Sequence, residues 1–340
     1  MVQIDPDTAV GYLNEIGILP VDAMASSKSL GGGISNNVIM VRWEEGCLVV
    51  KQPLDKLKVE MDWPADLHRI HIEANALRTY RRLLAVSGLE GASAPEVLHE
   101  DHVNHIIVME CIPSGSHMWK SELLSGVVDL DVAERLGSLL GSVETLASRD
   151  PDVRSMFTFK DHFDELRIDP YHRKAASVNP DIAELVLEEA ETVFSGEMTI
   201  VHGDYSPKSV LVERSVRPPR LWVFDMEVAH WGDPSFDTGF MLNHLLMKAV
   251  YLWEIRDDFL EAAHRFWNAY DGSVEWDIES RTVRELGCLM LARADGKSPV
   301  EYLDSGAGVK TIRRIARRSI KEGIGTIDEY IQLVMEEGGP

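Results

Sequence analysis

The sequence has few cysteines, few basic residues and no long uninterrupted apolar run, and each shortage excludes a class of protein. Its three cysteines are odd in number and far apart, so neither a disulfide framework nor a zinc site is expected. The 34 basic and 56 acidic residues give a net charge of -22. That charge disfavours a nucleic-acid groove or an anionic membrane surface as partner and suits a neutral or cationic small molecule.

The N-terminus and the most apolar segment both argue against membrane targeting. Acidic residues stand where a secretory signal peptide needs a basic start followed by an apolar stretch. Residues 240–255 are apolar but contain Asn243, His244 and Lys248, so they predict an amphipathic helix and not a membrane span. With so little cysteine, a cytoplasmic location is expected.

The first third of the chain predicts a small sheet with one helix. Glycines 31–33 lead into the apolar residues 38–41, and a turn then precedes the apolar residues 47–51, which is typical of a β-hairpin. Apolar residues recur at three- and four-residue steps from 66 to 84, which predicts a helix with one buried face. Residues 105–110 predict a buried strand that ends before Pro113.

Beyond that proline the pattern is mainly helical. Short strands are predicted only near residues 198–201, 210–212 and 221–224. We therefore expect a small mixed lobe at residues 1–112 and a larger helical lobe at residues 113–340.

Two acidic motifs carry the chemistry. Asp204 lies in His202-Gly203-Asp204 after a short apolar strand, and Asp225 follows a second strand about twenty residues later. Phosphoryl transfer needs one carboxylate that orients the attacking hydroxyl and another that holds magnesium against the phosphates. Asp204 suits the first role and Asp225 the second, although either acid alone would be equally typical of a turn cap.

The segment from His202 to Ser209 resembles the catalytic loop of the superfamily that includes aminoglycoside phosphotransferases, choline kinases and methylthioribose kinases. The resemblance implies an α+β, protein-kinase-like fold with a small antiparallel β lobe and a larger helical lobe. It also implies ATP and Mg2+ as cofactors, Asp204 as the base, and Ser209, Asp225 and Glu227 as metal ligands. Many members have asparagine at the position of Ser209, whereas methylthioribose kinases are similar to this chain in having serine there and an Asp-x-Glu motif.

Lys51 and Glu73 are the candidates for binding the nucleotide phosphates. The segments around Lys51, Trp63 and Glu73 are similar to the strand-to-helix region of methylthioribose kinases. The resemblance implies that Lys51 contacts the α- and β-phosphates and that Glu73 pairs with Lys51. The alternative is a surface lysine and a solvated helix glutamate.

The rest of the nucleotide site is expected at the glycine run and after residue 110. Glycines allow close approach to phosphates, and the candidates for these contacts are Gly32, Gly33, Ser35 and Asn36. The run lacks the Gly-Lys-Ser/Thr ending of a P-loop, which excludes that motif. The backbone of Glu110 and Ile112 is expected to bind adenine.

Three polar regions downstream remain open to two interpretations. By resemblance, Arg313 and Arg314 contact a sugar acceptor, but a basic helix face is the alternative. Residues 163–171 and 292–299 line the acceptor pocket or form buried salt bridges. Asp237 and the ring of His202 are expected to position the catalytic loop.

These motifs predict an ATP-dependent kinase acting on a hydroxyl of a small molecule. A kinase of aminoglycoside-like natural products and a methylthioribose or related sugar kinase are the two branches. A nucleotide-binding pseudokinase scaffold is the rival, because Ser206 and Ser209 depart from the commonest loop. The sequence indicates neither the oligomeric state nor the choice between ATP and GTP.

Overall fold

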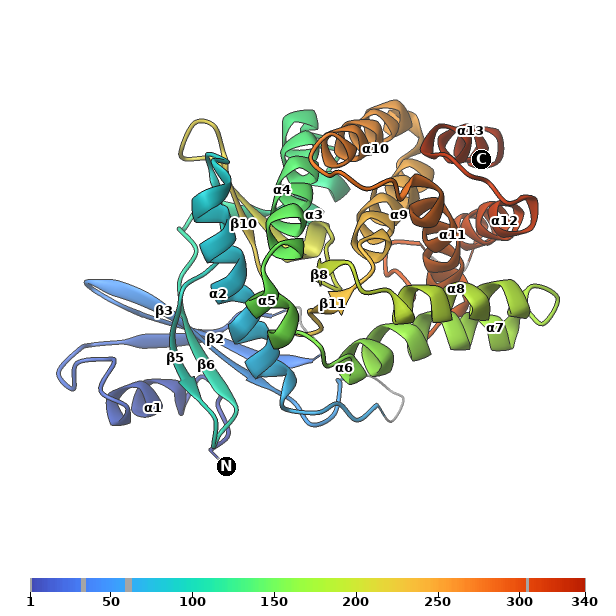
Figure 1. Cartoon of the computed structure of the whole chain (residues 1–340). Helices are drawn as coiled ribbons and strands as arrows, with labels where there is room; N and C mark the ends of the chain where they lie inside the picture. Colours follow the sequence, from blue (N-terminus) through green and yellow to red (C-terminus); the bar gives the residue numbers. More distant parts are fainter. Residues whose placement is uncertain (1, 32–34, 59–62, 304–305, 340) are drawn as a thin grey trace.

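The computed structural model describes residues 2–31, 35–58, 63–303 and 306–339. Figure 1 shows a sheet-rich part near the N-terminus beside a larger part made mostly of helices. The larger sheet is antiparallel, with its strands in the order β1-β2-β3-β6-β5. In chain order these strands span Ser26–Ser29, Asn36–Trp43, Gly46–Pro53, Val97–Asp101 and Ile106–Glu110.

Each face of this sheet is covered by a helix. Successive side chains of a strand point to opposite faces, so Ile106 and Val108 face one way and Ile107 and Met109 the other. The first pair packs in the same cluster as α1 (Ala9–Glu15), and the second in the same cluster as α2 (Arg69–Ser87). The cluster that contains α2 continues into the C-terminal helices, so α2 packs against both parts of the molecule.

The remaining elements form the helical part and two small sheets. The helical elements are α3 (Trp119–Leu124), α4 (Leu130–Ser148), α5 (Pro151–Met156), α6 (Asp161–Phe163), η1 (Asp164–Arg173), α7 (Lys174–Val178), α8 (Ala183–Ser195), η2 (Pro207–Ser209), α9 (Ser235–Tyr251), η3 (Trp253–Ile255), α10 (Arg256–Asp271), α11 (Glu279–Asp295), α12 (Ala307–Glu322) and α13 (Ile327–Glu337). The strands are β4 (Ala92–Ser93), β7 (Ser116–Met118), β8 (Thr199–Val201), β9 (Val210–Glu213), β10 (Arg220–Val223) and β11 (His230–Gly232). Their sheets have the orders β4-β10-β9-β7 and β11-β8.

The predicted fold class is confirmed, because an antiparallel sheet with helices is followed by a mainly helical part. The predicted hairpin is β2 and β3, the predicted helix is α2, and the three short downstream strands are β8, β9 and β10. The exact boundary between lobes after residue 112 stays a prediction. The expectation of only three short strands beyond Pro113 is wrong, because β7 and β11 are strands as well. The element η1 was not predicted either: it is a π-helical segment that contains Pro170, whose missing N–H and ring disfavour ordinary α-helical bonding.

The expectation that the cysteines stay unpaired is wrong for two of the three. Leu48 on β3 pairs with Glu110 on β6, and this antiparallel register places Cys47 opposite Cys111. Their Cα atoms lie 5.6 Å apart and their sulfurs form a disulfide, while Cys288 is free and buried. Because two of the three cysteines form a disulfide, cysteine usage no longer supports the expected cytoplasmic location.

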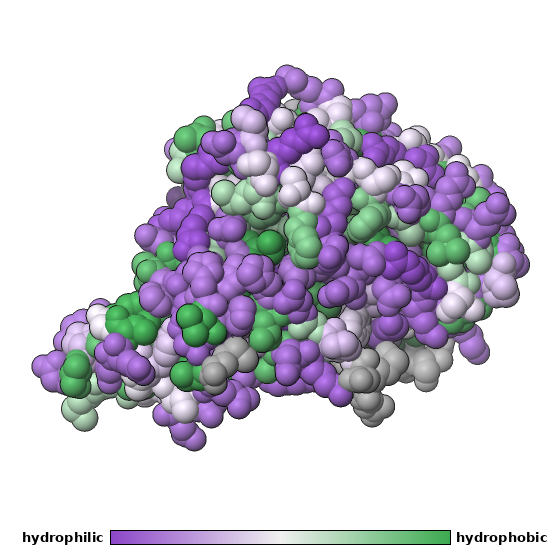
Figure 2. Space-filling model, turned by 60° about the horizontal axis from the view of Figure 1, so that its bottom comes forward, coloured by the Kyte–Doolittle hydropathy of each residue, from purple (hydrophilic) through white to green (hydrophobic). Residues whose placement is uncertain are grey.

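The prediction of an amphipathic helix over residues 240–255 is wrong for residues 240–250, which lie in a helix buried on all sides, and α9 ends at Tyr251 before η3. Residues 235–250 of α9 are all buried, including Asn243, His244 and Lys248. No helix of the described residues is long and apolar enough to cross a membrane. The face shown in Figure 2 is mainly hydrophilic, with small, separated hydrophobic areas.

Candidate active site

Lys51 joins three elements at the boundary between the sheet and the helical part. It lies on β3, and its Nζ is 2.7 Å from the carboxylate of Glu73 on α2. The same Nζ donates to Asp225 Oδ1, also at 2.7 Å, just after β10. The structure therefore brings together the lysine and two of the carboxylates that the sequence singled out.

Asp225 has a backbone conformation that few residues other than glycine adopt. Its φ is 68°, in the left-handed region, which costs on the order of 1 kcal/mol or more for a side chain with a Cβ. Such strain persists where the surroundings fix it. Here the ion pair with Lys51 holds the carboxylate in place.

Glu227 lies in the same group but has other partners. Its Oε2 accepts from Asn36 Nδ2 at 2.9 Å and from Arg69 Nε at 3.0 Å. Arg69 also donates to the backbone oxygen of Ser35 at 2.6 Å. Ser35 and Asn36, which follow the glycine run, are thus linked to Glu227 of the Asp-x-Glu motif by hydrogen bonds of Asn36 and Arg69.

The ionisation of this group follows from burial and charge. Burial alone would lower the pKa of Lys51, but Asp225, Glu73 and Glu227 raise it above its usual value. Burial would raise the pKa of Asp225, yet Lys51 and Lys208 hold it well below the usual value. Burial raises the pKa of Glu73 to about 7.

Asp204 is held on one oxygen and open on the other. Its Oδ2 is 3.0 Å from Arg167 Nη2 and 2.7 Å from Lys208 Nζ. Its Oδ1 is buried and has no hydrogen-bond partner. The hydroxyls of Ser206 and Ser209 are also buried without a partner.

The catalytic loop is positioned as predicted by Asp237 and His202. The Asp237 carboxylate accepts the backbone N–H of His202 at 2.6 Å and of Gly203 at 2.9 Å. Asp204 donates its backbone N–H to His202 Nδ1, while His202 Nε2 lies 3.2 Å from the oxygen of Phe224. Burial lowers the pKa of His202 to about 4, so the ring is neutral and bridges the two acidic motifs.

Two cations, Arg293 and Lys248, lie beside His244 on α9. Arg293 on α11 stacks over Tyr171 and lies 3.2 Å from His244 on α9. Among the described residues neither Arg293 nor the fully buried Lys248 has a carboxylate partner within 4 Å. Burial would raise the pKa of Tyr171, but Arg293 and Arg167 lower it below the usual value, which marks a positive potential.

The other predicted site residues are distributed as follows. Gly32 and Gly33 lie outside the described residues. Glu110 and Ile112 border a surface hollow of about 480 Å³ beside the β2–β3 turn. Arg313 forms an ion pair with Asp295, and the exposed Arg314 forms one with Glu337. Neither arginine is paired with Asp204.

The sequence did not assign roles to Arg69 or Lys208, and it left Arg167 and Arg293 open between an acceptor pocket and a salt-bridge network. Lys208 could have been found, because it is four residues after Asp204 within the recognised loop. Arg167 and Arg293 carried no such signal of position, since Arg167 reaches Asp204 from η1 and Arg293 reaches Tyr171 from α11.

The chain shares sequence similarity with known phosphotransferases. The family model described as "Phosphotransferase enzyme family" matches residues 26–276. Methylthioribose kinase 2 of Oryza sativa subsp. japonica is 27% identical over 249 residues, which cover 65% of this chain and 56% of that protein. The 4-hydroxytryptamine kinase of Psilocybe cyanescens is 25% identical over 253 residues, covering 66% and 68%. The chain thus spans little more than half the length of the rice relative.

Two solved structures share the fold. A microcompartment-associated aminopropanol kinase superposes with a TM-score of 0.58 at 14% identity, covering 93% of this chain and 99% of the other. An amicoumacin kinase in complex with AMP-PNP and Ca2+ has a TM-score of 0.56 at 12% identity, covering 96% and 97%. Because the family model matches most of the chain, residues 26–276, the chain belongs to the phosphotransferase enzyme family.

Proposed function

We propose that this protein is an ATP-dependent kinase that transfers the γ-phosphoryl group to a hydroxyl of a small molecule. The observation that carries the proposal is the position of Lys51, held between Glu73 and Asp225. Phosphoryl transfer in this fold requires a strand lysine fixed by a helix glutamate and an aspartate at the metal position. The kinases among its relatives support the same reaction class.

For the nucleotide, Lys51 contacts the phosphates and Glu73 fixes its position. Ser35 and Asn36 flank the phosphates together with Gly32 and Gly33, and the backbone of Glu110 and Ile112 binds adenine. These assignments rest on the resemblance to the superfamily and on the tie between Asn36 and Glu227.

For Mg2+, the proposed ligands are Asp225, Glu227 and Ser209. They offer the oxygen atoms that this ion prefers. The fit is supported by the unpartnered, buried Ser209 hydroxyl and by the Asp225 side chain, which is 28% exposed. The bound ion would neutralise phosphate charge.

Asp204 is the proposed base that orients the attacking hydroxyl. Its buried Oδ1 is free to accept a hydrogen bond, and Arg167 and Lys208 fix the other oxygen. Holding the carboxylate in this way directs one oxygen at the acceptor, which is how positioning contributes to the rate.

The charges near Tyr171 favour a neutral or anionic acceptor over a polycation. The positive charges of Arg167, Lys208 and Arg293 all lower the pKa of Tyr171. Like charges repel, so we expect these residues to disfavour binding of an aminoglycoside amine. The overall charge of -22 suggested the opposite, but local charges decide binding at short range. A neutral sugar such as methylthioribose, or a hydroxylated acid, is therefore proposed before a cationic antibiotic.

Phosphate transfer from radiolabelled ATP with magnesium tests the function. The acceptor panel holds methylthioribose, other free sugars, hydroxy acids, aminoglycosides and choline. We expect labelling of a neutral or anionic acceptor, and a loss of about 10²- to 10⁴-fold in kcat for Asp204→Asn with ATP affinity retained.

The pseudokinase alternative predicts a different result. ATP would bind, no acceptor would be labelled, and Asp204→Asn would change no measurable activity. Labelling of aminoglycosides alone would keep the kinase and overturn the proposed acceptor charge.

A further inference from the structure

Histidines are concentrated in one short stretch outside the proposed active site. The chain has 12 histidines, and those between residues 68 and 105 are His68, His71, His99, His102 and His105. His68 is the residue before α2, His71 is in the first turn of α2, and His105 is in the turn between β5 and β6. Residues three apart at a helix start lie on one face, so His68 and His71 both face that turn.

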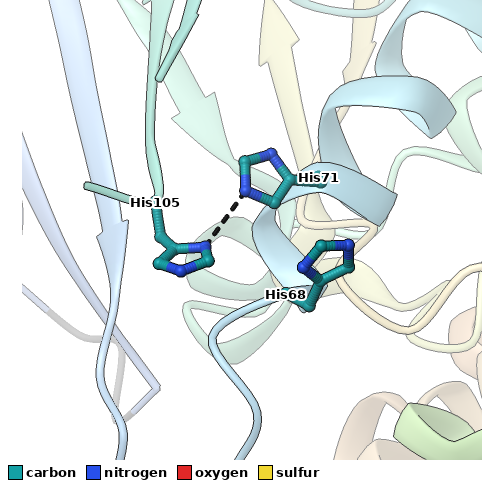
Figure 3. A group of neighbouring side chains, drawn as sticks. All are labelled: His68, His71 and His105. Carbon is teal, nitrogen blue, oxygen red and sulfur yellow. Dashed lines mark hydrogen bonds between the residues drawn. The ribbon is translucent and has the colours of Figure 1, made fainter. Parts of the chain in front are cut away.

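The three imidazoles of His68, His71 and His105 converge (Figure 3). His71 Nε2 lies 3.1 Å from His105 Nδ1. The ring centroid of His68 is 5.0 Å from that of His71 and 6.2 Å from that of His105. One nitrogen from each ring can be chosen so that all lie within 4.8 Å of one another.

These spacings are close to those of a zinc site. With Zn–N bonds of about 2.0–2.1 Å, neighbouring nitrogens of a tetrahedral site are about 3.4 Å apart. The nitrogens of His71 and His105 lie 3.1 Å apart in a hydrogen bond, which is close to that spacing, and a bound ion would replace the proton between them. His68 is exposed, so its side chain can adjust by the remaining distance.

One carboxylate holds the ring of His71, and another holds the turn that carries His105. Glu100 Oε1 is 2.7 Å from His71 Nδ1, so Nδ1 donates and Nε2 keeps its lone pair for the cluster. A carboxylate on the far nitrogen is the usual support of a metal-binding histidine. The turn that carries His105 is fixed by Asp101, whose side chain accepts the backbone N–H groups of Val103 and Asn104.

We propose that His68, His71 and His105 bind one divalent transition-metal ion of the Zn2+ class through three imidazole nitrogens. The open fourth position would hold water, as in other three-ligand zinc sites. Imidazole ligands select Zn2+, Ni2+ or Cu2+ over Mg2+ and Ca2+, which prefer oxygen. The ion is therefore distinct from the magnesium proposed for the nucleotide.

A second grouping, His71 with Glu100 and His102, is the weaker candidate. Glu100 already accepts from Arg78 as well as from His71, so its charge is matched. Using His71 Nδ1 for the metal would break that support, whereas using Nε2 preserves it.

Such an ion would tie the start of α2 to the β5–β6 turn. His71 is two residues before Glu73, which pairs with Lys51. On the other side, the backbone oxygen of Asn104 accepts from Gln52, the residue after Lys51. The metal would thus stabilise the N-terminal end of the helix that fixes the phosphate-binding lysine.

The test is zinc binding by the full-length protein after removal of metals with a chelator. Competition with a chromogenic zinc indicator should give one site in the unmodified protein. His68→Asn and His105→Asn should each weaken binding at least tenfold, and the double variant should abolish it. Glu100→Gln should weaken it about 10- to 100-fold through the support of His71.

Two matched variants serve as controls. His117→Asn removes an exposed histidine from β7, and Arg78→Gln removes another partner of Glu100. Both should bind zinc like the unmodified protein, and zinc should raise the melting temperature of both but not of the double variant. Absence of zinc binding by the unmodified protein, or equal binding by the double variant, would falsify the proposal.

Discussion

The two sides of the proposed active site have opposite charge. On the nucleotide side, Lys51 faces Glu73 and Asp225, and Arg69 faces Glu227, so carboxylates outnumber cations. On the acceptor side, Arg167 and Lys208 share the single carboxylate of Asp204.

This contrast shows why net charge is a poor guide to the acceptor. A carboxylate excess suits a site that must gather Mg2+ and then receive phosphates. A cation excess suits a ligand that brings its own negative charge or none. Most of these side chains are buried, and screening there is weaker than at the surface, although Lys208 is 44% exposed.

Removing the central cation should have the largest effect. Lys51→Met leaves Glu73 and Asp225 without their partner, so we expect a loss of about 3–5 kcal/mol in the free energy of unfolding and loss of phosphate transfer. Urea denaturation and the ATP assay measure the two effects.

A paired variant separates the ion pair from general disruption. Adding Glu73→Gln to Lys51→Met should recover part of the lost stability without recovering activity, because one uncompensated buried charge is gone. Lys208→Met is the control, since this side chain is 44% exposed and should change stability by less than about 1 kcal/mol. No recovery in the double variant would count against charge balance as the cause.

Arg293→Gln should weaken binding of the acceptor without changing binding of ATP. Losing a charged hydrogen-bond donor is worth about 1.5–3 kcal/mol, so the acceptor KM should rise about 10- to 100-fold while the KM for ATP stays unchanged. Steady-state kinetics with each substrate varied in turn measure this. Arg265→Gln, an exposed arginine paired with Glu261 on α10, is the matched control. Equal changes in both KM values would place Arg293 in the fold and not in the acceptor site.

The nucleotide side was more predictable from sequence than the acceptor side. Lys51, Glu73 and Asp225 lie in short segments whose strand and helix patterns are strong, and a superfamily resemblance covers them. The structure brings these three residues into one ion-pair group. Their roles in binding nucleotide and metal stay predictions.

The acceptor side and the disulfide depend on long-range packing. Arg167 and Arg293 reach their positions through a π-helical segment and a distant helix, and helix positions carry no spacing code for such a meeting. Cys47 and Cys111 are 64 residues apart, and only the β3–β6 register shows that they are opposite. The resemblance assigned Arg313 and Arg314 to the acceptor, whereas the structure pairs them with Asp295 and Glu337.

The smallest effect is a pH dependence from Lys248. Burial, together with Lys120 and Arg293, lowers its pKa from 10.5 to about 7. Between these values the unfolded chain binds more protons than the folded one, so stability should rise with pH from about 7 to 10. The slope should be at most about 1.4 kcal/mol per pH unit.

Urea denaturation at several pH values between 7 and 9 measures this slope, with Lys248→Met as the comparison. The variant has no proton to release at this position, so the part of the slope due to Lys248 should vanish. If both proteins gave the same slope, Lys248 would be charged in the folded state. That result would mean that the opposing charge of Glu301 outweighs burial and the charges of Lys120 and Arg293.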